Sequence, residues 1–326
     1  MFGKMMNRYY YGKSGKGDFE KDDLPVTRIQ LFWEMLRIRF SALIRLNCTY
    51  AVVWLPAIFV IARAAMLFYS GIVHLGGLEA GVQAGTTLQA DLTEATALFS
   101  SASYALIFQT LVLLVPCIAI TGPFTAGLCY VTRNWARDEH AFAWADYKDA
   151  MKANWKQALV ISTITGFMPL FTYVCYVFYG DLMAKSALFI IPQVLSMFVV
   201  ALWACMLIFL YPQLVTYELT FRNLLKNSLL LAVARLPFTI LFRLLSLVPC
   251  IIGIVVGMVT PYFQFVVIFL SFYYIFIGFS LSRFVGASFS NAVFDRYINV
   301  KIEGAQVGRG LYNEEDDDED YEEDER

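Results

Sequence analysis

Arginine is the residue type here that could bind a ligand inside an apolar environment. Arg63, Arg235 and Arg243 lie within or at the edges of long apolar stretches. Arg235 and Arg243 are eight residues apart, which places them about 80° around a helix and on one broad face. No acidic residue lies between Glu218 and Asp295 to pair with them locally. The three guanidiniums could meet lipid phosphates, helix C-terminal carbonyls or an anionic ligand, and we favour a structural or lipid-facing role.

Residues for catalysis or metal binding are sparse. The sequence contains no G-x-x-x-x-G-K-[ST], H-E-x-x-H or G-x-S-x-G motif, and its six cysteines form no C-x-x-C pair. The two histidines, His74 and His140, are far apart. Asp138 and Glu139 adjoin His140, but adjacent residues do not share a helix face, so we predict a solvated turn. We therefore expect no enzymatic activity, no cofactor and no metal site.

Six apolar stretches dominate the chain. Hydrophobic residues make up 59 % of it and charged residues 16 %, whereas roughly 25 % of residues are charged in an average soluble domain. Each stretch can cross, or nearly cross, a hydrocarbon core of about 30 Å. The sequence therefore predicts an all-α, polytopic membrane helix bundle with about six transmembrane helices. The stretches are 48–69, 103–127, 157–179, 186–211, 236–258 and 263–285.

Lys and Arg lie mainly in alternate gaps between these stretches, with Lys185 as the exception in the other gaps. By the positive-inside rule both termini are cytoplasmic. The segment 26–46 mixes arginines with Phe, Trp and Leu, which predicts an amphipathic helix in the cytoplasmic interface. An extension of the first transmembrane helix is the alternative.

The domain organisation follows from this topology. We expect a flexible cytoplasmic N-terminus over 1–25 and a transmembrane helical domain over 26–300. Within that domain, 70–102 is predicted to be an extracytoplasmic insertion, mostly loop with a short surface helix, and 128–156 a cytoplasmic helical loop. Residues 301–326 are predicted to be a disordered acidic cytoplasmic tail, because dense like charge prevents burial of apolar surface.

Proline and glycine recur within the apolar stretches. Proline removes a backbone donor and tends to kink or interrupt a helix, and interrupted helices can mark a cavity. Proline is also common in membrane helices without such a role. Gly253 and Gly257 form a GxxxG pattern, which serves either dimerisation or internal packing. Homo-oligomerisation is therefore left open.

Residues 121–159 carry a pattern of their own. A stretch ending in G-P-x-T-A-G-L is followed by an aromatic and arginine-rich helix, then by W-x-D and K-x-N. This pattern resembles the YesL family of bacterial membrane proteins (domain of unknown function 624), and a second stretch, 225–242, is also similar to it. The matching residues of the first pattern are Gly122, Pro123, Thr125, Ala126, Gly127, Leu128, Arg133, Trp135, Arg137, Trp144, Asp146, Lys152 and Asn154.

The resemblance covers roughly 28–68 and 103–300. It implies a location in the bacterial cell membrane and an accessory role in carbohydrate uptake, with a sugar ABC importer or sensor subunit as partner. The 70–102 insertion, the N-terminal arm and the acidic tail depart from the family pattern, so nothing about them follows from the resemblance.

The pattern also has a physical interpretation. Gly122 and Pro123 would end or bend the second transmembrane helix, and the small residues after them would allow close packing. Arg133 and Arg137, one turn apart, could clamp phosphates or the carboxylates of a partner. We therefore predict that 128–156 forms a cytoplasmic docking surface.

Three classes of function remain, which are an accessory or regulatory membrane protein, a small-solute transporter or channel, and a membrane enzyme. We favour the first. Membrane lipids are expected partners, and nucleic acid is not.

Overall fold

The computed structural model describes residues 25–260 and 263–312, and within these ranges it contains helices and no strands. Six helical segments are long and apolar enough to cross a membrane, which confirms the predicted all-α, polytopic architecture. The helices are α2 (Arg28–Gln83), α3 (Gln89–Trp135), α4 (Ala145–Met183), η2 (Ala187–Phe189), α5 (Ile190–Thr216), α6 (Phe221–Ala234), α7 (Leu236–Val259), α8 (Phe263–Tyr273), η3 (Tyr274–Gly278), α9 (Phe279–Tyr297) and η4 (Asn299–Lys301).

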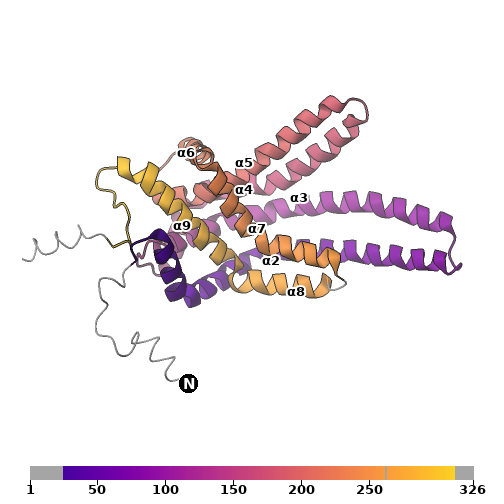
Figure 1. Ribbon diagram of the computed structural model, residues 1–326, viewed down its shortest axis with the longest axis horizontal. Coiled ribbons are helices and arrows are strands. Elements are labelled where there is room, and N and C mark those ends of the chain that lie inside the picture. Colours follow the sequence, from indigo (N-terminus) through magenta and orange to yellow (C-terminus); the bar gives the residue numbers. More distant parts are fainter. Residues whose placement is uncertain (1–24, 261–262, 313–326) are drawn as a thin grey trace, which may run out of the picture.

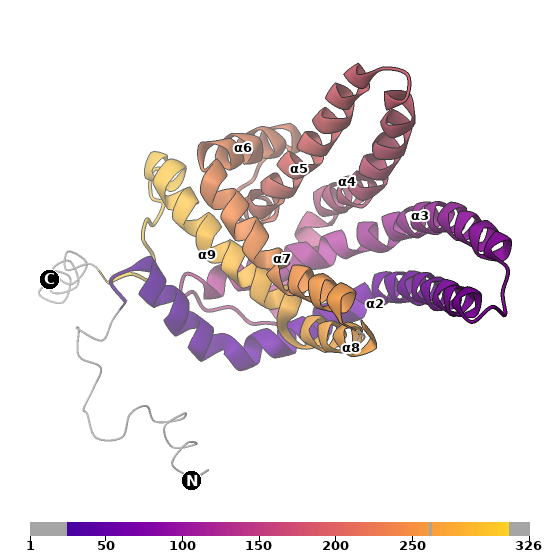
Figure 2. The same ribbon diagram turned by 45° about the vertical axis from the view of Figure 1, so that its right-hand side comes forward.

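Three helical hairpins diverge from one end of the molecule (Figure 1). The hairpins α2–α3, α4–α5 and α7–α8 each turn at the far end, and we call their outer parts the arms. The start of α2, the end of α3, the start of α4, helix α6 and the end of α9 gather at the common end, which we call the base (Figure 2). The described terminal segments both lie at the base, where the Tyr312 amide donates to the Pro25 carbonyl at 3.0 Å.

The α2–α3 arm replaces the loop predicted for 70–102. Helix α2 continues to Gln83 and α3 begins at Gln89, so only a short turn lies outside the helices. The predicted surface helix in this region is the first part of α3. The loop prediction was wrong because it gave weight to glycines that lie within helix α2. Gly71 leaves room for the ring of Phe99 on α3, and the two helices pair at this point.

The N-terminal part of α2 is not a separate interfacial helix. Residues 28–46 are continuous with the first transmembrane helix, which was the alternative left open by the sequence. One face of this part is buried in the base and includes Leu31, Met35 and Leu43. The other face exposes Trp33 and Phe40. The amphipathic pattern therefore marks a helix that packs on the base through one face.

Helix α3 lies at the centre of the packing and contacts α2, α4, α5 and α9. Its contact with α4 depends on glycine. A Cβ atom on Gly122 would lie 2.3 Å from the Ala158 carbonyl oxygen, and one on Gly166 would lie 3.0 Å from that of Val115. The expected end of the helix at Gly122 and Pro123 is not observed, because α3 continues through both to Trp135.

A buried asparagine supports the irregular segment between α8 and α9. Residues Tyr274–Gly278 form a π-helical turn, which changes the register between the two helices. The Asn47 amide nitrogen donates to the carbonyls of Tyr274 and Ile275 at 2.8 and 2.7 Å, and its oxygen accepts from the Ser280 amide at 2.8 Å. Asn47 is fully buried. It therefore satisfies three backbone groups at the turn that orients α9.

The C-terminal segment 301–312 is ordered on the base, contrary to the prediction of disorder from residue 301. Gly308 and Gly310 adopt positive φ angles, and a Cβ atom on Gly310 would lie 2.7 Å from the Arg137 carbonyl oxygen. Leu311 packs against the apolar core of the base. The acidic run itself, 314–326, and residues 1–24 lie outside the described residues.

Replacing Asn47 with leucine should destabilise the protein by about 2–3 kcal/mol, because three buried backbone groups lose their partner. We expect a lower midpoint of thermal unfolding for the purified protein in detergent. Thr49→Val is the matched control, since Thr49 is exposed and bonds only within its own helix. Equal midpoints for the two variants would contradict the role assigned to Asn47.

Candidate functional site

Glu139 lies among three arginines at the base. Its carboxylate oxygens are 3.3 Å from Arg137 Nε, 3.4 Å from Arg309 Nε and 4.0 Å from Arg133 Nη1. The Glu139 side chain is 16 % exposed, and Arg137 is buried. Arg137 also donates to the Gln306 carbonyl at 3.2 Å. Glu139 and its arginines therefore join the end of α3 to the C-terminal segment.

This arrangement corrects two predictions. Glu139 was predicted to lie in a solvated turn, yet it is the anion of an ion-pair cluster. Asp138 before it adopts a left-handed conformation with φ of 56°, which turns the chain directly after α3. Arg133 and Arg137 were expected to clamp phosphates or a partner's carboxylates. They pair instead with a carboxylate of their own chain, which local spacing did not indicate.

A second polar network holds α9 to the start of α2. Asp295 forms an ion pair with Arg28 and accepts from the Gly308 amide at 3.2 Å. Asn299 donates to Asp295 at 2.5 Å and accepts from the Tyr217 hydroxyl at 2.6 Å. Burial raises the pKa of Tyr217 to about 12, and the carboxylate of Asp295 adds to this increase. The phenol therefore stays protonated and keeps its role as donor at neutral pH.

Much of the predicted motif has a structural role. Thr125 is buried and hydrogen bonds with the Tyr50 hydroxyl at 2.6 Å. Gly127 allows the Tyr147 backbone of α4 to approach, since a Cβ atom would lie 2.6 Å from its carbonyl oxygen. Trp135 is buried in the base. Small residues at 125–127 were expected to let a following arginine-rich helix pack closely, whereas Gly127 allows α3 itself to approach α4.

The last members of the motif lie at the start of α4. Asp146 accepts from the Phe142 amide at 2.8 Å, and Asn154 donates to the Ala150 carbonyl at 3.0 Å. Trp144 and Lys152 are exposed. The motif thus divides into a buried part, which holds the hairpin together, and an exposed part.

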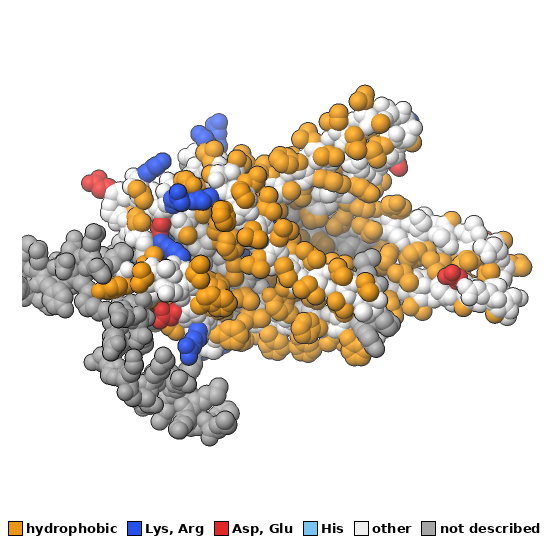
Figure 3. Space-filling model, viewed as in Figure 1, with side chains coloured by type: hydrophobic (Ala, Val, Ile, Leu, Met, Phe, Trp, Pro, Cys, Tyr) orange, Lys and Arg blue, Asp and Glu red, His pale blue; other side chains and the backbone are white. Residues whose placement is uncertain are grey.

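The exposed part lies in a surface of aromatic and basic side chains, which we call the base surface. Lys148 Nζ is 4.4 Å from the centre of the Trp144 ring, and Lys156 Nζ is 5.7 Å from that of Trp155. Figure 3 shows Lys and Arg side chains gathering on the base, whereas hydrophobic side chains cover much of the arms. The base surface comprises Phe142, Trp144, Lys148, Lys152, Trp155 and Lys156.

The three arginines predicted within or beside the membrane lie apart. Arg63 is exposed on the α2 arm. Arg235 lies between α6 and α7, with its guanidinium carbon 5.5 Å from the centre of the Tyr297 ring. Arg243 lies within α7, near Arg283 of α9. Arg235 is the N-cap of α7, where the helical geometry is interrupted after α6, and its carbonyl accepts from the Thr239 amide at 2.9 Å.

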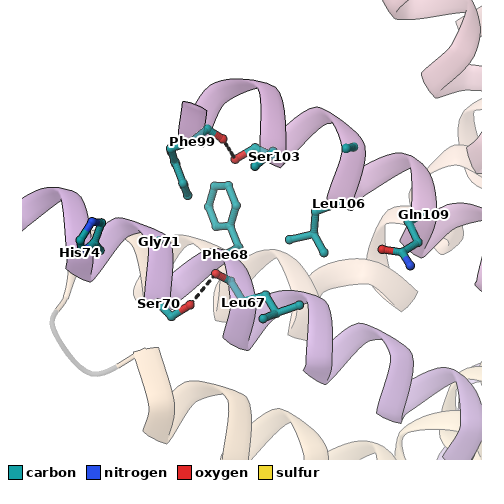
Figure 4. Close-up of a pocket in the computed structure, with 11 residues that line it drawn as sticks. Leu67, Phe68, Ser70, Gly71, His74, Phe99, Ser103, Leu106 and Gln109 are labelled. Carbon is teal, nitrogen blue, oxygen red and sulfur yellow. Dashed lines mark hydrogen bonds between the residues drawn. The ribbon is translucent and has the colours of Figure 1, made fainter. Parts of the chain in front are cut away.

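The arm formed by α2 and α3 encloses an open cleft of about 540 Å³. Figure 4 shows Phe68 and Phe99 between the two helices, with His74 towards one end and Gln109 towards the other. The hydroxyls of Ser70 and Ser103 donate to carbonyls of their own helices, so they are not directed at a ligand. The cleft therefore offers mainly apolar and aromatic walls.

The roles of three residues, namely Asn47, Glu139 and Asp295, were not predicted from the sequence. Asn47 is a polar residue beside a long apolar stretch, and that signal could have identified it. Within the described part of the chain, no three His, Cys, Asp or Glu side chains come together as a candidate metal site.

Replacing Gly122 with alanine should destabilise the protein by about 1–3 kcal/mol, because the new methyl group forces α3 and α4 apart. The measurement is thermal unfolding in detergent. Gly180→Ala is the matched control, as a Cβ atom there has no neighbour within 4 Å. That variant should be neutral or slightly stabilising, and a similar loss in both would contradict the close contact.

Replacing Glu139 with glutamine should loosen the C-terminal segment 302–312, because three arginines lose their carboxylate partner. We expect amide hydrogen exchange in this segment to become at least about tenfold faster. Glu303→Gln is the control, since Glu303 is exposed. Unchanged exchange in Glu139→Gln would show that the cluster does not hold the segment.

Comparisons with known proteins bear on the α3–α4 hairpin. No curated protein and no solved structure matches the chain. Residues 102–177 match a family described as "Protein of unknown function, DUF624". The match begins within α3, passes through the base and ends within α4, so it contains the whole motif from Gly122 to Asn154. This hairpin is therefore similar to that family, in agreement with the domain of unknown function expected from the sequence.

Proposed function

We propose that this protein is a non-enzymatic accessory or regulatory component of the bacterial cell membrane, associated with carbohydrate uptake or utilisation. Its base surface would dock a sugar ABC importer or sensor subunit on the cytoplasmic side, with both termini on that side. The link to carbohydrate comes from the resemblance to the YesL family. The structural support comes from the base.

The observation that carries the proposal is the exposure of aromatic side chains in the matched segment. Phe142, Trp144 and Trp155 are 66, 56 and 49 % exposed, and three lysines, Lys148, Lys152 and Lys156, lie in the same segment. Exposed aromatic residues are enriched in surfaces that bind other proteins. The buried part of the motif holds the α3–α4 hairpin together, and these contacts fix the position of the base surface.

The arms leave apolar faces open to the membrane. In the most apolar windows, 6 % of the residues of α7 and 11 % of those of α2 and of α3 are buried. Lipid is the expected neighbour of these faces, and helices of a partner could also lie along them. Neither role requires chemistry from the chain, in keeping with the expectation of no enzymatic activity.

Site-specific photocrosslinking in native membranes tests the proposal. We would replace Trp144 and, separately, Trp155 with a photoreactive phenylalanine analogue and identify the adducts by mass spectrometry. We expect a carbohydrate importer or sensor subunit at both positions. Phe178 is the matched control position, because it is 58 % exposed but lies near the far end of α4.

Adducts with lipid alone, or with proteins unrelated to carbohydrate uptake, would contradict the proposal. Those outcomes would favour the alternative, a small-solute transporter or channel. One observation supports that alternative, which is that two arginines, Arg243 and Arg283, lie within the apolar helices α7 and α9.

A further inference from the structure

Three lysines line one side of α4 near its start. Lys148, Lys152 and Lys156 are four residues apart, so they follow one another along the helix at intervals of about 6 Å. Lys148 Nζ lies over the Trp144 ring, and Lys156 Nζ lies over the Trp155 ring. We call the three lysines the lysine stripe, and they are the basic part of the base surface.

The lysine stripe has no anionic partner among the residues that the structure describes. The ion pairs there are made by arginines, with Glu139 or Asp295 as the acid. Lys152 and Lys156 are exposed, and Lys148 is half-buried. The stripe therefore presents three positive charges to any segment that lies over it.

The described chain ends on the same part of the base as the lysine stripe. Leu311 packs against the buried cluster to which Tyr147 belongs, and the Tyr147 ring is stacked on the Trp144 ring with their centres 6.3 Å apart. Lys148 directly follows Tyr147 in α4. Glu314, the first acidic residue of the run 314–326, comes three residues after Leu311, which is at most about 11 Å of chain. The acidic run therefore has the reach to cover the stripe.

The acidic run also has the charge and the spacing to pair with the stripe. Residues 314–326 contain eleven acidic residues and one arginine. In an extended chain, alternate side chains point the same way at intervals of about 6.6 Å, which is close to the interval of about 6 Å between successive lysines. The short connection to Leu311 keeps the local concentration of the run high. We propose that the acidic run 314–326 docks on the lysine stripe of its own chain.

The docked run covers the basic part of the base surface when no partner is bound. A partner that binds this surface through the lysines has to displace the run, so the run lowers the affinity of docking. This consequence rests on the proposed function, whereas the contact between the run and the stripe does not.

Photocrosslinking within the full chain tests the contact. A photoreactive phenylalanine analogue replaces Tyr321, which lies within the run. The purified protein is placed in lipid nanodiscs that contain phosphatidylglycerol, with no partner protein present. Adducts are identified by mass spectrometry of the monomer band, which separates contacts within one chain from contacts between copies. We expect adducts within 142–156, the segment that contains the base surface.

Removal of the lysine charges should lower the yield of these adducts about threefold or more, because three ion pairs are lost. The test variant carries Lys148→Gln, Lys152→Gln and Lys156→Gln. The control variant removes the same charge from exposed positions outside the stripe and should keep the yield; it carries Lys185→Gln, Arg222→Gln and Lys226→Gln.

Equal yields from the test and control variants would overturn the inference. Adducts with lipid alone, with a second copy alone or with other parts of the chain alone would also overturn it. If the test variant fails to fold, residues 314–320 are replaced with the corresponding amides, which removes seven carboxylates from the run. An undiminished yield would then overturn the inference. Because no partner protein is present, none of these outcomes depends on whether the base surface binds an importer or sensor subunit.

Discussion

The close contact between α3 and α4 is the constraint on which the rest of the structure depends. Glycine at positions 122, 127 and 166 lets the two backbones approach where any side chain would collide with main-chain atoms. Because α3 also packs against α2, α5 and α9, its position relative to α4 determines where those helices lie. The segment that matches the family of unknown function is this same hairpin, and its glycines have a packing role that accounts for their presence in the motif.

Polar side chains in the bundle and base then give the packing its specificity. Apolar helices in a membrane can rotate or slide with little change in free energy, because lipid and helix surfaces are similarly apolar. Hydrogen bonds and ion pairs are more selective, since a misplaced partner leaves a buried polar group unsatisfied. Asn47 fixes α2 against the π-helical turn, and Glu139 fixes the end of α3 against the C-terminal segment.

Helices were predicted from the sequence more accurately than the contacts between them. The six membrane-length helices were predicted because hydropathy over about 20 residues is a local property. The hairpin at 70–102 was predicted to be mostly loop, although its glycines are helical once two helices pair. The residues 26–46 were interpreted as an interfacial helix because one apolar face is typical both of helices on lipid and of helices packed on protein. The break between α6 and α7 at Arg235 was not predicted, because nothing local indicated that the helical geometry is interrupted there.

By itself, the sequence determined the all-α class, the number of membrane-length helices and the concentration of basic side chains between alternate helices, since each depends on residues that are near one another in the chain. Only the tertiary structure decided which polar groups meet. Asp295 meets Arg28 because the end of α9 lies beside the start of α2, and Glu139 meets Arg309 because the C-terminal segment folds back over the base. These pairings join residues 267 and 170 positions apart. They depend on the rotation and crossing of packed helices, which no local pattern of residues specifies.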